Sequence, residues 1–147
     1  MIKGKFPVEK FKSLDTPFYF YDIELLRETL NLVKKETEYK NFVIHYAIKA
    51  NANPRILQEI ASFGFGADCV SGNEIIVAVE NGFEPSKIAF AGVGKTDKEI
   101  NIALDYDIFC FNVESLPEME AIEELAKIKN KTARIALRIN PNVDAHT

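Results

Sequence analysis

Apolar and polar positions follow two periods along this chain, and the two periods predict helices and strands in alternation. One amphipathic helix is predicted from residue 23 by apolar side chains at three- to four-residue spacing, namely Ile23, Leu26, Leu30 and Val33. Residues 42–49 are instead a short and mostly apolar run, which predicts a buried strand. Pro54 suits the first turn of the next helix, and Gly64 is a typical residue just after a helix end.

The strand–helix unit then recurs along the chain. Further strands are predicted at residues 66–70, 87–91, 108–111 and 132–139, with helices at 54–63, 71–82, 97–106 and 115–129. Ser71-Gly-Asn-Glu74 has the spacing of a capping box. Leu116, Met119, Ile122 and Leu125 form the apolar stripe of the last helix. This alternation, at intervals of roughly twenty residues, predicts right-handed βαβ units and a parallel sheet.

The faces of the strands favour a (β/α)8 barrel over an open doubly wound sheet. In the first strand, His45, Ala47 and Lys49 share one face, and the opposite face is apolar. In the last strand, Arg134, Ala136, Arg138 and Asn140 lie opposite Ile135, Leu137 and Ile139. A sheet covered by helices on both faces would be more uniformly apolar. One polar face therefore predicts a barrel interior that leads to a polar site.

The length predicts only part of such a barrel. The 147 residues supply about five core strands, whereas a complete barrel takes about 250 residues. We therefore expect a partial barrel over residues 22–147, as the front part of a longer protein. Residues 1–21 form a lead-in segment in which Phe18-Tyr-Phe-Tyr21 has strand propensity, and Asp22 is a candidate helix N-cap.

Composition excludes several classes of protein. The net charge is −4 and no basic cluster occurs, which argues against nucleic acid or an anionic membrane as a partner. No apolar run approaches the ~20 residues of a membrane span, and the first residues lack the apolar region of a signal peptide. Cys69 and Cys110 lie in apolar runs and are expected to pack in the core. No metal-ligand spacing occurs. A cytoplasmic protein is the expectation.

Lys49 is the candidate catalytic residue because it lies at the carboxyl end of an apolar strand. In parallel α/β folds, that end of the sheet carries the chemistry. A lysine amine can also act as a covalent nucleophile towards carbonyl groups. The pattern alone favours the plainer alternative, a strand-end lysine that points to solvent, because most strand-end lysines are solvated.

Five stretches of the sequence resemble one known family. They are His45-Tyr-Ala-Ile-Lys-Ala-Asn51, Ala67-Asp-Cys-Val-Ser-Gly-Asn-Glu74, Phe90-Ala-Gly-Val-Gly-Lys-Thr96, Phe111-Asn-Val-Glu-Ser115 and Leu137-Arg-Ile-Asn-Pro-Asn-Val-Asp-Ala145. The first resembles the lysine motif of the fold-type III pyridoxal-phosphate decarboxylases and the alanine racemases. In order and spacing, the five together resemble the diaminopimelate decarboxylases.

The resemblance implies a partial barrel of the alanine racemase-like type, followed in the full-length protein by a C-terminal β-domain to which the strand at residues 18–21 belongs. It implies pyridoxal 5′-phosphate as cofactor, an amino acid as substrate and a homodimer when full length. The reaction implied is decarboxylation of meso-2,6-diaminopimelate to L-lysine. A related decarboxylase of arginine, ornithine or carboxynorspermidine, or a pyridoxal-phosphate-binding barrel without catalysis, remains as an alternative.

Four residues are candidates for the cofactor site, and two of them, Lys49 and Arg138, match residues of the family. Lys49 matches the lysine that holds the cofactor as a Schiff base, and Ala47 is small enough for the cofactor ring to lie against the strand. Asp68 is expected to pair with Lys49 or to lie near the cofactor, with a solvent-facing carboxylate as the alternative. Arg138 matches an arginine near the cofactor ring, or is held by a carboxylate such as Asp144.

Three further polar residues receive other expectations. Glu74 is explained as the capping partner of Ser71. His45 is expected to be a satisfied core histidine, deeper on the face that carries Lys49. The stretch Gly92-Val-Gly-Lys-Thr96 lacks the glycine spacing of a phosphate-binding loop. Its lysine, Lys95, is expected to contact substrate or solvent.

Overall fold

A computed structural model describes residues 4–39, 41–139 and 141 of the chain. The chain folds as two compact units, and the boundary between them in the sequence lies between Phe42 and Val43.

The first unit contains two helices and a cluster of aromatic rings. The helices are α1 (Val8–Phe11) and α2 (Ile23–Glu38), and Asp22 caps α2 by accepting a hydrogen bond from the Leu25 amide at 3.0 Å. The rings of Phe18 and Phe20 lie 5.2 and 5.0 Å from that of Phe11. No strand forms over residues 18–21, because a strand needs a hydrogen-bonded partner and none of the described residues pairs with this run. Its pairing with a β-domain therefore stays a prediction.

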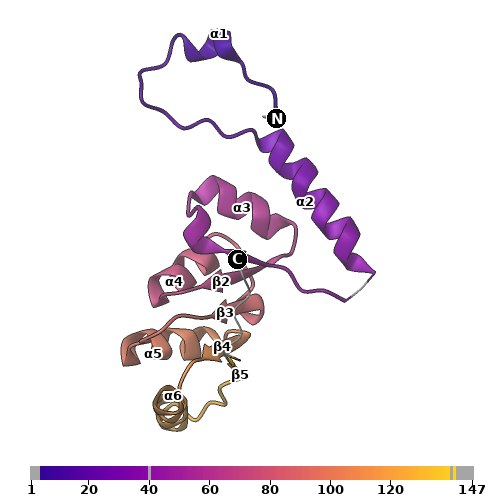
Figure 1. The fold of residues 1–147 in the computed structure, drawn as a ribbon. Coiled ribbons are helices and arrows are strands. Elements are labelled where there is room, and N and C mark those ends of the chain that lie inside the picture. Colours follow the sequence, from indigo (N-terminus) through magenta and orange to yellow (C-terminus); the bar gives the residue numbers. More distant parts are fainter. Residues whose placement is uncertain (1–3, 40, 140, 142–147) are drawn as a thin grey trace. The chain divides into compact units, whose positions relative to one another are not determined.

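The second unit is one parallel sheet, and a helix connects each strand to the next along the chain (Figure 1). The strands are β1 (His45–Ala47), β2 (Gly66–Cys69), β3 (Ile88–Phe90), β4 (Cys110–Val113) and β5 (Ile135–Leu137). The helices are α3 (Pro54–Ser62), α4 (Gly72–Glu80), α5 (Asp97–Tyr106) and α6 (Leu116–Ile128), with short 3-10 turns η1 (Ile48–Ala50) and η2 (Pro85–Lys87). The predicted helices are confirmed.

Strand order settles the choice between barrel and open sheet. The order is β1-β2-β3-β4-β5, so every strand pairs in parallel with its neighbour in sequence. Right-handed crossovers in one unreversed series place all the helices on the same face of the sheet. A doubly wound sheet would reverse its order at a switch point. The predicted partial barrel is confirmed.

The register assigns each strand residue to one of the two faces. The outer face, which the helices cover, carries buried apolar side chains: Ala67, Cys69, Ile88, Phe90, Phe111 and Val113. On the inner face, Ala47 is level with Asp68, Asp68 with Ala89, and Asn112 with Ala136. Cys69 and Cys110 are buried and free, as predicted, and burial raises the pKa of Cys69 to about 12.

Two strands are much shorter than predicted and a third is shifted along the chain by two residues. In the run 42–49, Phe42 and Val43 are exposed and the last two residues turn into η1, so only His45–Ala47 is a strand. The prediction at 108–111 starts two residues early, because the Arg134 guanidinium takes the carbonyls of residues 108 and 109. The last strand spans three residues of the predicted 132–139, and only β4 pairs with it among the described residues.

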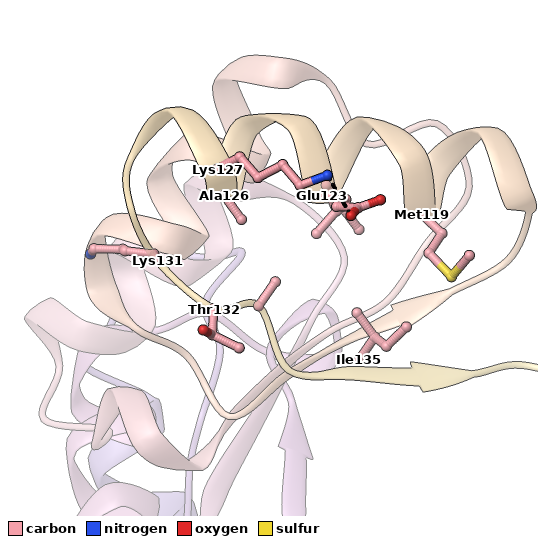
Figure 2. A pocket seen from close by; sticks show the side chains of 9 residues that line it. Met119, Glu123, Ala126, Lys127, Lys131, Thr132 and Ile135 are labelled. Carbon is pink, nitrogen blue, oxygen red and sulfur yellow. Dashed lines mark ion pairs between the residues drawn. The ribbon is translucent and has the colours of Figure 1, made fainter.

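The apolar stripe predicted for α6 is partly wrong. Leu116 is 69% exposed, whereas Ile122 and Ala126 are the buried residues of the helix. Between α6 and β5 lies a hollow of about 380 Å³ that Met119, Ile122, Ala126 and Ile135 line, with the Glu123–Lys127 ion pair beside it (Figure 2). None of the predicted site residues lines this hollow.

The helices of the described residues include none with the length and apolar character of a membrane span.

Gly66 is required at the start of β2 by close backbone packing. A Cβ atom there would overlap the carbonyl oxygen of Lys87 and would lie 2.6 Å from Cδ2 of His45. We therefore expect Gly66→Ala to lower the free energy of unfolding by about 1–3 kcal/mol, the usual cost of overpacking. Chemical denaturation of the complete protein measures this loss. His45→Ala/Gly66→Ala is the control: it should remain destabilised because the backbone overlap persists, and full recovery would contradict the interpretation.

Candidate active site

The inner face of the sheet holds a hollow at the carboxyl ends of its strands. Its volume is about 360 Å³, within the roughly 300–1,000 Å³ of typical ligand pockets. The residues that line it come from four neighbouring strands and the loops after them: Asp68, Ala91, Asn112, Glu114, Ala136, Leu137 and Arg138. Two of the four predicted site residues, Asp68 and Arg138, therefore meet in one place. Small side chains on the same face leave the space open.

Ala47 lies next to this hollow on the first strand, and Lys49 follows it in the turn after that strand. Ala47 is the register partner of Asp68 in the neighbouring strand. Lys49 does not continue the strand face as predicted, because the chain turns into η1 after Ala47 while Ile48 enters the core. The Lys49 side chain is exposed. Within the described residues, Lys49 and Asp68 form no ion pair with each other.

Arg138 is held by a carboxylate that the sequence did not single out. Its Nη1 atom donates a hydrogen bond to Oε1 of Glu114 at 3.0 Å. The Glu114 side chain is 17% exposed and that of Arg138 is 66% exposed. The expected alternative partner, Asp144, lies outside the described residues. The guanidinium thus extends from the rim of the hollow, with one carboxylate of the rim holding it.

His45 lies deeper on the inner face, and its environment differs from the expectation. Nε2 of the ring is buried without a hydrogen-bond partner among the described residues, so the prediction of a satisfied histidine is wrong for this atom. The ring lies 5.8 Å from that of Phe109. Burial lowers the pKa of His45, and the negative charge of Asp68 opposes part of that shift.

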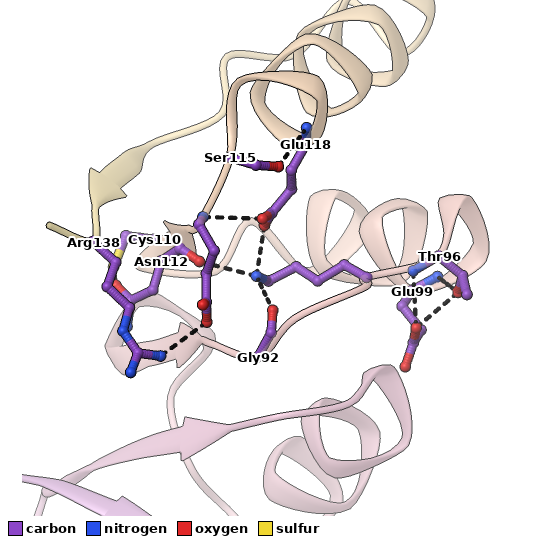
Figure 3. A network of polar contacts seen from close by, with 10 residues as sticks. Gly92, Thr96, Glu99, Cys110, Asn112, Ser115, Glu118 and Arg138 are labelled. Carbon is purple, nitrogen blue, oxygen red and sulfur yellow. Dashed lines mark hydrogen bonds and ion pairs between the residues drawn. The ribbon is translucent and has the colours of Figure 1, made fainter. Parts of the chain in front are cut away.

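Lys95 is part of a buried ion pair, so the expected contact with substrate or solvent is wrong (Figure 3). Its side chain is 1% exposed and that of Glu118 is 10% exposed. The ammonium donates to Oε1 of Glu118 at 2.6 Å and to the carbonyls of Gly92 and Asn112, both at 2.9 Å. The ring of Phe90 lies 5.2 Å from the same nitrogen. All three ammonium protons are therefore used inside the protein.

A capping pattern recurs at three successive strand-to-helix loops. In each loop a hydroxyl residue is followed three positions later by a glutamate, in the pairs Ser71/Glu74, Thr96/Glu99 and Ser115/Glu118. The hydroxyl accepts from the glutamate amide, and the glutamate accepts from a backbone amide before the helix. The predicted capping box of Ser71 and Glu74 is confirmed in part: the Ser71 hydroxyl accepts from the Glu74 amide, but the Glu74 carboxylate accepts from the Val70 amide and not from that of Ser71.

Two of these glutamates, Glu99 and Glu118, also bind the preceding strand-to-helix segment of the chain. Glu99 accepts from the Gly72 amide at 3.0 Å and so ties α5 to the first turn of α4. A Cβ atom on Gly72 would lie 2.8 Å from Cγ of Glu99, so a glycine permits this close approach. Glu118 reaches back to Lys95 in the same way. The loops at the carboxyl ends of the strands are thus linked in series.

Glu99 should make stability depend on pH. Hydrogen bonds from the amides of Gly72 and Thr96 and from the Thr96 hydroxyl lower its pKa below the ordinary value of 4.5. A depressed carboxylate pKa stabilises the folded state above the unfolded pKa, and that stabilisation is lost as the pH falls through the folded pKa. We expect Glu99→Gln to lower stability near neutral pH and to flatten its decline below about pH 4.5. Denaturation curves at several pH values measure both effects, and parallel curves for the variant and the wild type would contradict them.

Sequence comparison places these residues in a known family. Residues 24–147 match the family described as the pyridoxal-binding domain of pyridoxal-dependent decarboxylases. The chain belongs to this family. The family match thus covers all of the second unit and all of α2 except its first residue, Ile23.

Relatives and solved structures show which members of this family the chain is similar to. The chain is 58% identical to diaminopimelate decarboxylase of Bacteroides thetaiotaomicron over 99% of its own length and 38% of that protein. It is similar to the crystal structure of diaminopimelate decarboxylase from Helicobacter pylori complexed with L-lysine, at 44% identity and a TM-score of 0.88, over 95% of this chain and 36% of that one. An arginine decarboxylase of Paramecium bursaria Chlorella virus matches at 26% identity and a TM-score of 0.65, over 79% of this chain and 32% of that one.

The chain thus spans little more than a third of the length of the relatives that it matches. The residues present in this chain suit a pyridoxal group. An exposed lysine amine can bind its aldehyde, the small inner-face side chains leave room for a flat ring, and Arg138 offers a cation at the rim. In the described part of the chain, no three His, Cys, Asp or Glu side chains gather where a metal ion could bind.

The sequence did not single out Glu114, Glu118 or Glu99. A signal for two of them was present, because Thr96-Asp-Lys-Glu99 and Ser115-Leu-Pro-Glu118 repeat the spacing of Ser71-Gly-Asn-Glu74. Glu114 had no such signal, because its role depends on β5 pairing beside β4.

Proposed function

We propose that the complete protein is a pyridoxal-phosphate-dependent decarboxylase that converts meso-2,6-diaminopimelate to L-lysine and carbon dioxide. The observation that carries the proposal is the 58% identity to a diaminopimelate decarboxylase over 99% of this chain. The similarity to a solved diaminopimelate decarboxylase that holds L-lysine supports it. The bond between the carboxylate and its α-carbon breaks, the carboxylate leaves as carbon dioxide, and a proton takes its place on the carbon.

Pyridoxal phosphate, when bound, supplies the electron sink for the pair of electrons that the departing carboxylate leaves behind. Lys49 would hold that group covalently through its amine. Its place in η1, just past the strand, lets the side chain reach out from the sheet. Ala47, two residues earlier, is small and leaves the ring space against the strand.

Asp68 and Arg138 would provide the charged groups of the site from opposite sides of the hollow. Asp68 lies level with Ala47 and places a negative charge next to the first strand. Arg138 reaches in from β5 with its charge partly balanced by Glu114. Opposite charges at two walls orient a polar ligand between them, which is the positioning that such chemistry needs.

The assembly of the complete protein is part of the same proposal. We infer a homodimer in the cytoplasm, with an amino acid as the small-molecule substrate and sites completed at the subunit interface. Residues 1–21 would lead into the barrel from a C-terminal β-domain, with residues 18–21 as a strand of that domain. Their exposed aromatic side chains, Phe18, Tyr19, Phe20 and Tyr21, support this assignment, because exposed aromatic runs favour packing against another surface.

A decarboxylase of a basic amino acid, such as arginine or ornithine, is the second candidate. The similarity to a viral arginine decarboxylase favours it, but at 26% identity against 58% for the diaminopimelate enzyme. Carbon dioxide release from meso-diaminopimelate, arginine and ornithine separates the two. We expect release from meso-diaminopimelate alone. Release from arginine or ornithine would replace the proposal, and release from none would indicate a barrel that binds pyridoxal phosphate without catalysis.

A further inference from the structure

We propose that the buried Lys95–Glu118 ion pair, acting through Glu114, positions Arg138 at the rim of the cofactor site. This inference deepens the proposed function and rests on it. Lys95, Glu118 and Glu114 are positioning residues here, because none of them needs to touch the reacting atoms. Figure 3 shows the chain of contacts.

The first link fixes the loops after β3 and β4 to each other. Lys95 comes from the loop after β3, yet it binds the carbonyl of Asn112 in β4 at 2.9 Å and Glu118 of α6 at 2.6 Å. It also closes its own loop on the carbonyl of Gly92. Asn112 and Ala91, next to Gly92, both line the hollow. Lys95 itself does not line it and so supports that wall from behind.

The second link runs from Glu118 to the backbone of Glu114. Oε1 of Glu118 accepts from Lys95, and Oε2 accepts from the Glu114 amide at 3.0 Å. One carboxylate therefore joins the ammonium to the residue that directly follows β4. Because the Glu118 side chain is only 10% exposed, solvent screens these contacts little.

The third link runs from Glu114 to the arginine. Glu114 holds Nη1 of Arg138 at 3.0 Å, and the Arg138 amide donates to the carbonyl of Val113 at 2.9 Å. The arginine side chain is 66% exposed, so packing restricts it little. A long side chain of this kind has many rotamers, and a carboxylate whose own backbone is fixed selects among them. Arg138 is thus oriented through Glu114.

Stability alone does not explain the buried pair. An ion pair in a protein interior loses hydration, and apolar residues of similar volume are often as stabilising in its place. The Lys95–Glu118 pair instead joins three backbone positions, and one of these belongs to Glu114, whose side chain holds Arg138 at the hollow. A positioning role accounts for this set of partners, and it predicts an effect on cofactor binding that is separate from folding.

A double-mutant cycle on the complete holoenzyme tests the last link. We expect Glu114→Ala and Arg138→Ala each to raise the dissociation constant for pyridoxal phosphate about tenfold, the loss of one good polar contact. If Glu114 acts through Arg138, the double variant Glu114→Ala/Arg138→Ala should also lose about tenfold rather than about a hundredfold. Glu114→Gln, which keeps an acceptor oxygen, should restore most of the affinity.

A second pair of variants tests the buried link. Lys95→Met/Glu118→Met should fold, because both charges are removed together, and should still weaken cofactor binding several-fold. The matched control is Lys129→Met/Asp105→Asn, which removes an ion pair of 2.6 Å between residues of α5 and the end of α6. We expect the control to bind the cofactor as the wild type does.

The outcomes separate this inference from the proposed function. Borohydride reduction of the wild-type holoenzyme should give a pyridoxyl adduct on Lys49, and its absence there would overturn the proposed function. With the adduct present, unchanged cofactor affinity in Glu114→Ala, or additive losses in the double variant, would overturn only the positioning role. Equal losses in the Lys129/Asp105 control would also overturn it, because the effect would then be general.

Discussion

Lys49→Ala is expected to reduce decarboxylation by the complete protein at least about a thousandfold, which corresponds to about 4 kcal/mol of transition-state stabilisation. The amine is the only group that residue 49 offers for a covalent link to an aldehyde, and alanine offers none. The variant should also lose the pyridoxyl adduct after borohydride reduction. Because the Lys49 side chain is exposed, we expect little change in the free energy of unfolding.

Three measurements check this prediction: the rate of carbon dioxide release, the absorption of bound cofactor, and peptide mapping after reduction. Lys98→Ala is the matched control, because Lys98 is an exposed lysine of α5 away from the hollow. It should keep wild-type rates. A Lys49→Ala protein that still decarboxylates within about tenfold of wild type would rule out the assigned role of Lys49.

Sequence predicted the helices best because their signals are local. Asp22, Asn53, Ser71, Thr96 and Ser115 each precede a helix, and each accepts a hydrogen bond from a backbone amide of its first turn. Apolar spacing and caps both act within a few residues of chain. The order of strands was also predictable, because strand–helix alternation allows few topologies.

Strand ends were predicted poorly because they depend on distant residues. The apolar run at 42–49 was interpreted as one strand, but pairing with β2 extends only to Ala47, and Lys49 lies in η1. The alternation argument that placed Lys49 on the inner face therefore does not apply to it. The family motif is what makes Lys49 a candidate, whereas the strand pattern predicted the wrong secondary structure for it. A family resemblance survives such an error because it does not depend on the secondary structure assigned.

Lys95 shows what spacing alone could not predict. Its loop was expected to face substrate or solvent, yet its three hydrogen-bond partners come from the loop, from β4 and from α6. Two of those partners are backbone carbonyls. Any residue can supply a carbonyl, so the sequence carries no signal for these two contacts. Only the Ser115–Glu118 spacing pointed towards one partner, and it pointed to a cap rather than to an ion pair.

Lys95→Met alone is expected to lower the free energy of unfolding by about 3–5 kcal/mol, because it leaves the Glu118 carboxylate buried without its cation. Lys95→Met/Glu118→Met should recover most of that loss, since neither charge then remains to be desolvated. Some loss should persist, because the carbonyls of Gly92 and Asn112 and the Glu114 amide lose their side-chain partners.

Urea denaturation of the complete protein, for the wild type, both single variants and the double variant, measures the coupling between the two residues. Lys129→Met provides a matched control: its amine is also 2.6 Å from a carboxylate, but that carboxylate, on Asp105, is 60% exposed and stays hydrated when its partner is removed. We expect a loss of at most about 1 kcal/mol there. If Lys95→Met cost no more than this control, or if the double variant were as unstable as Lys95→Met, the pair would not act as a coupled buried unit. The charges would then be incidental to the wall of the hollow, and the hydrogen bonds to backbone atoms would have to explain why the loops after β3 and β4 stay together.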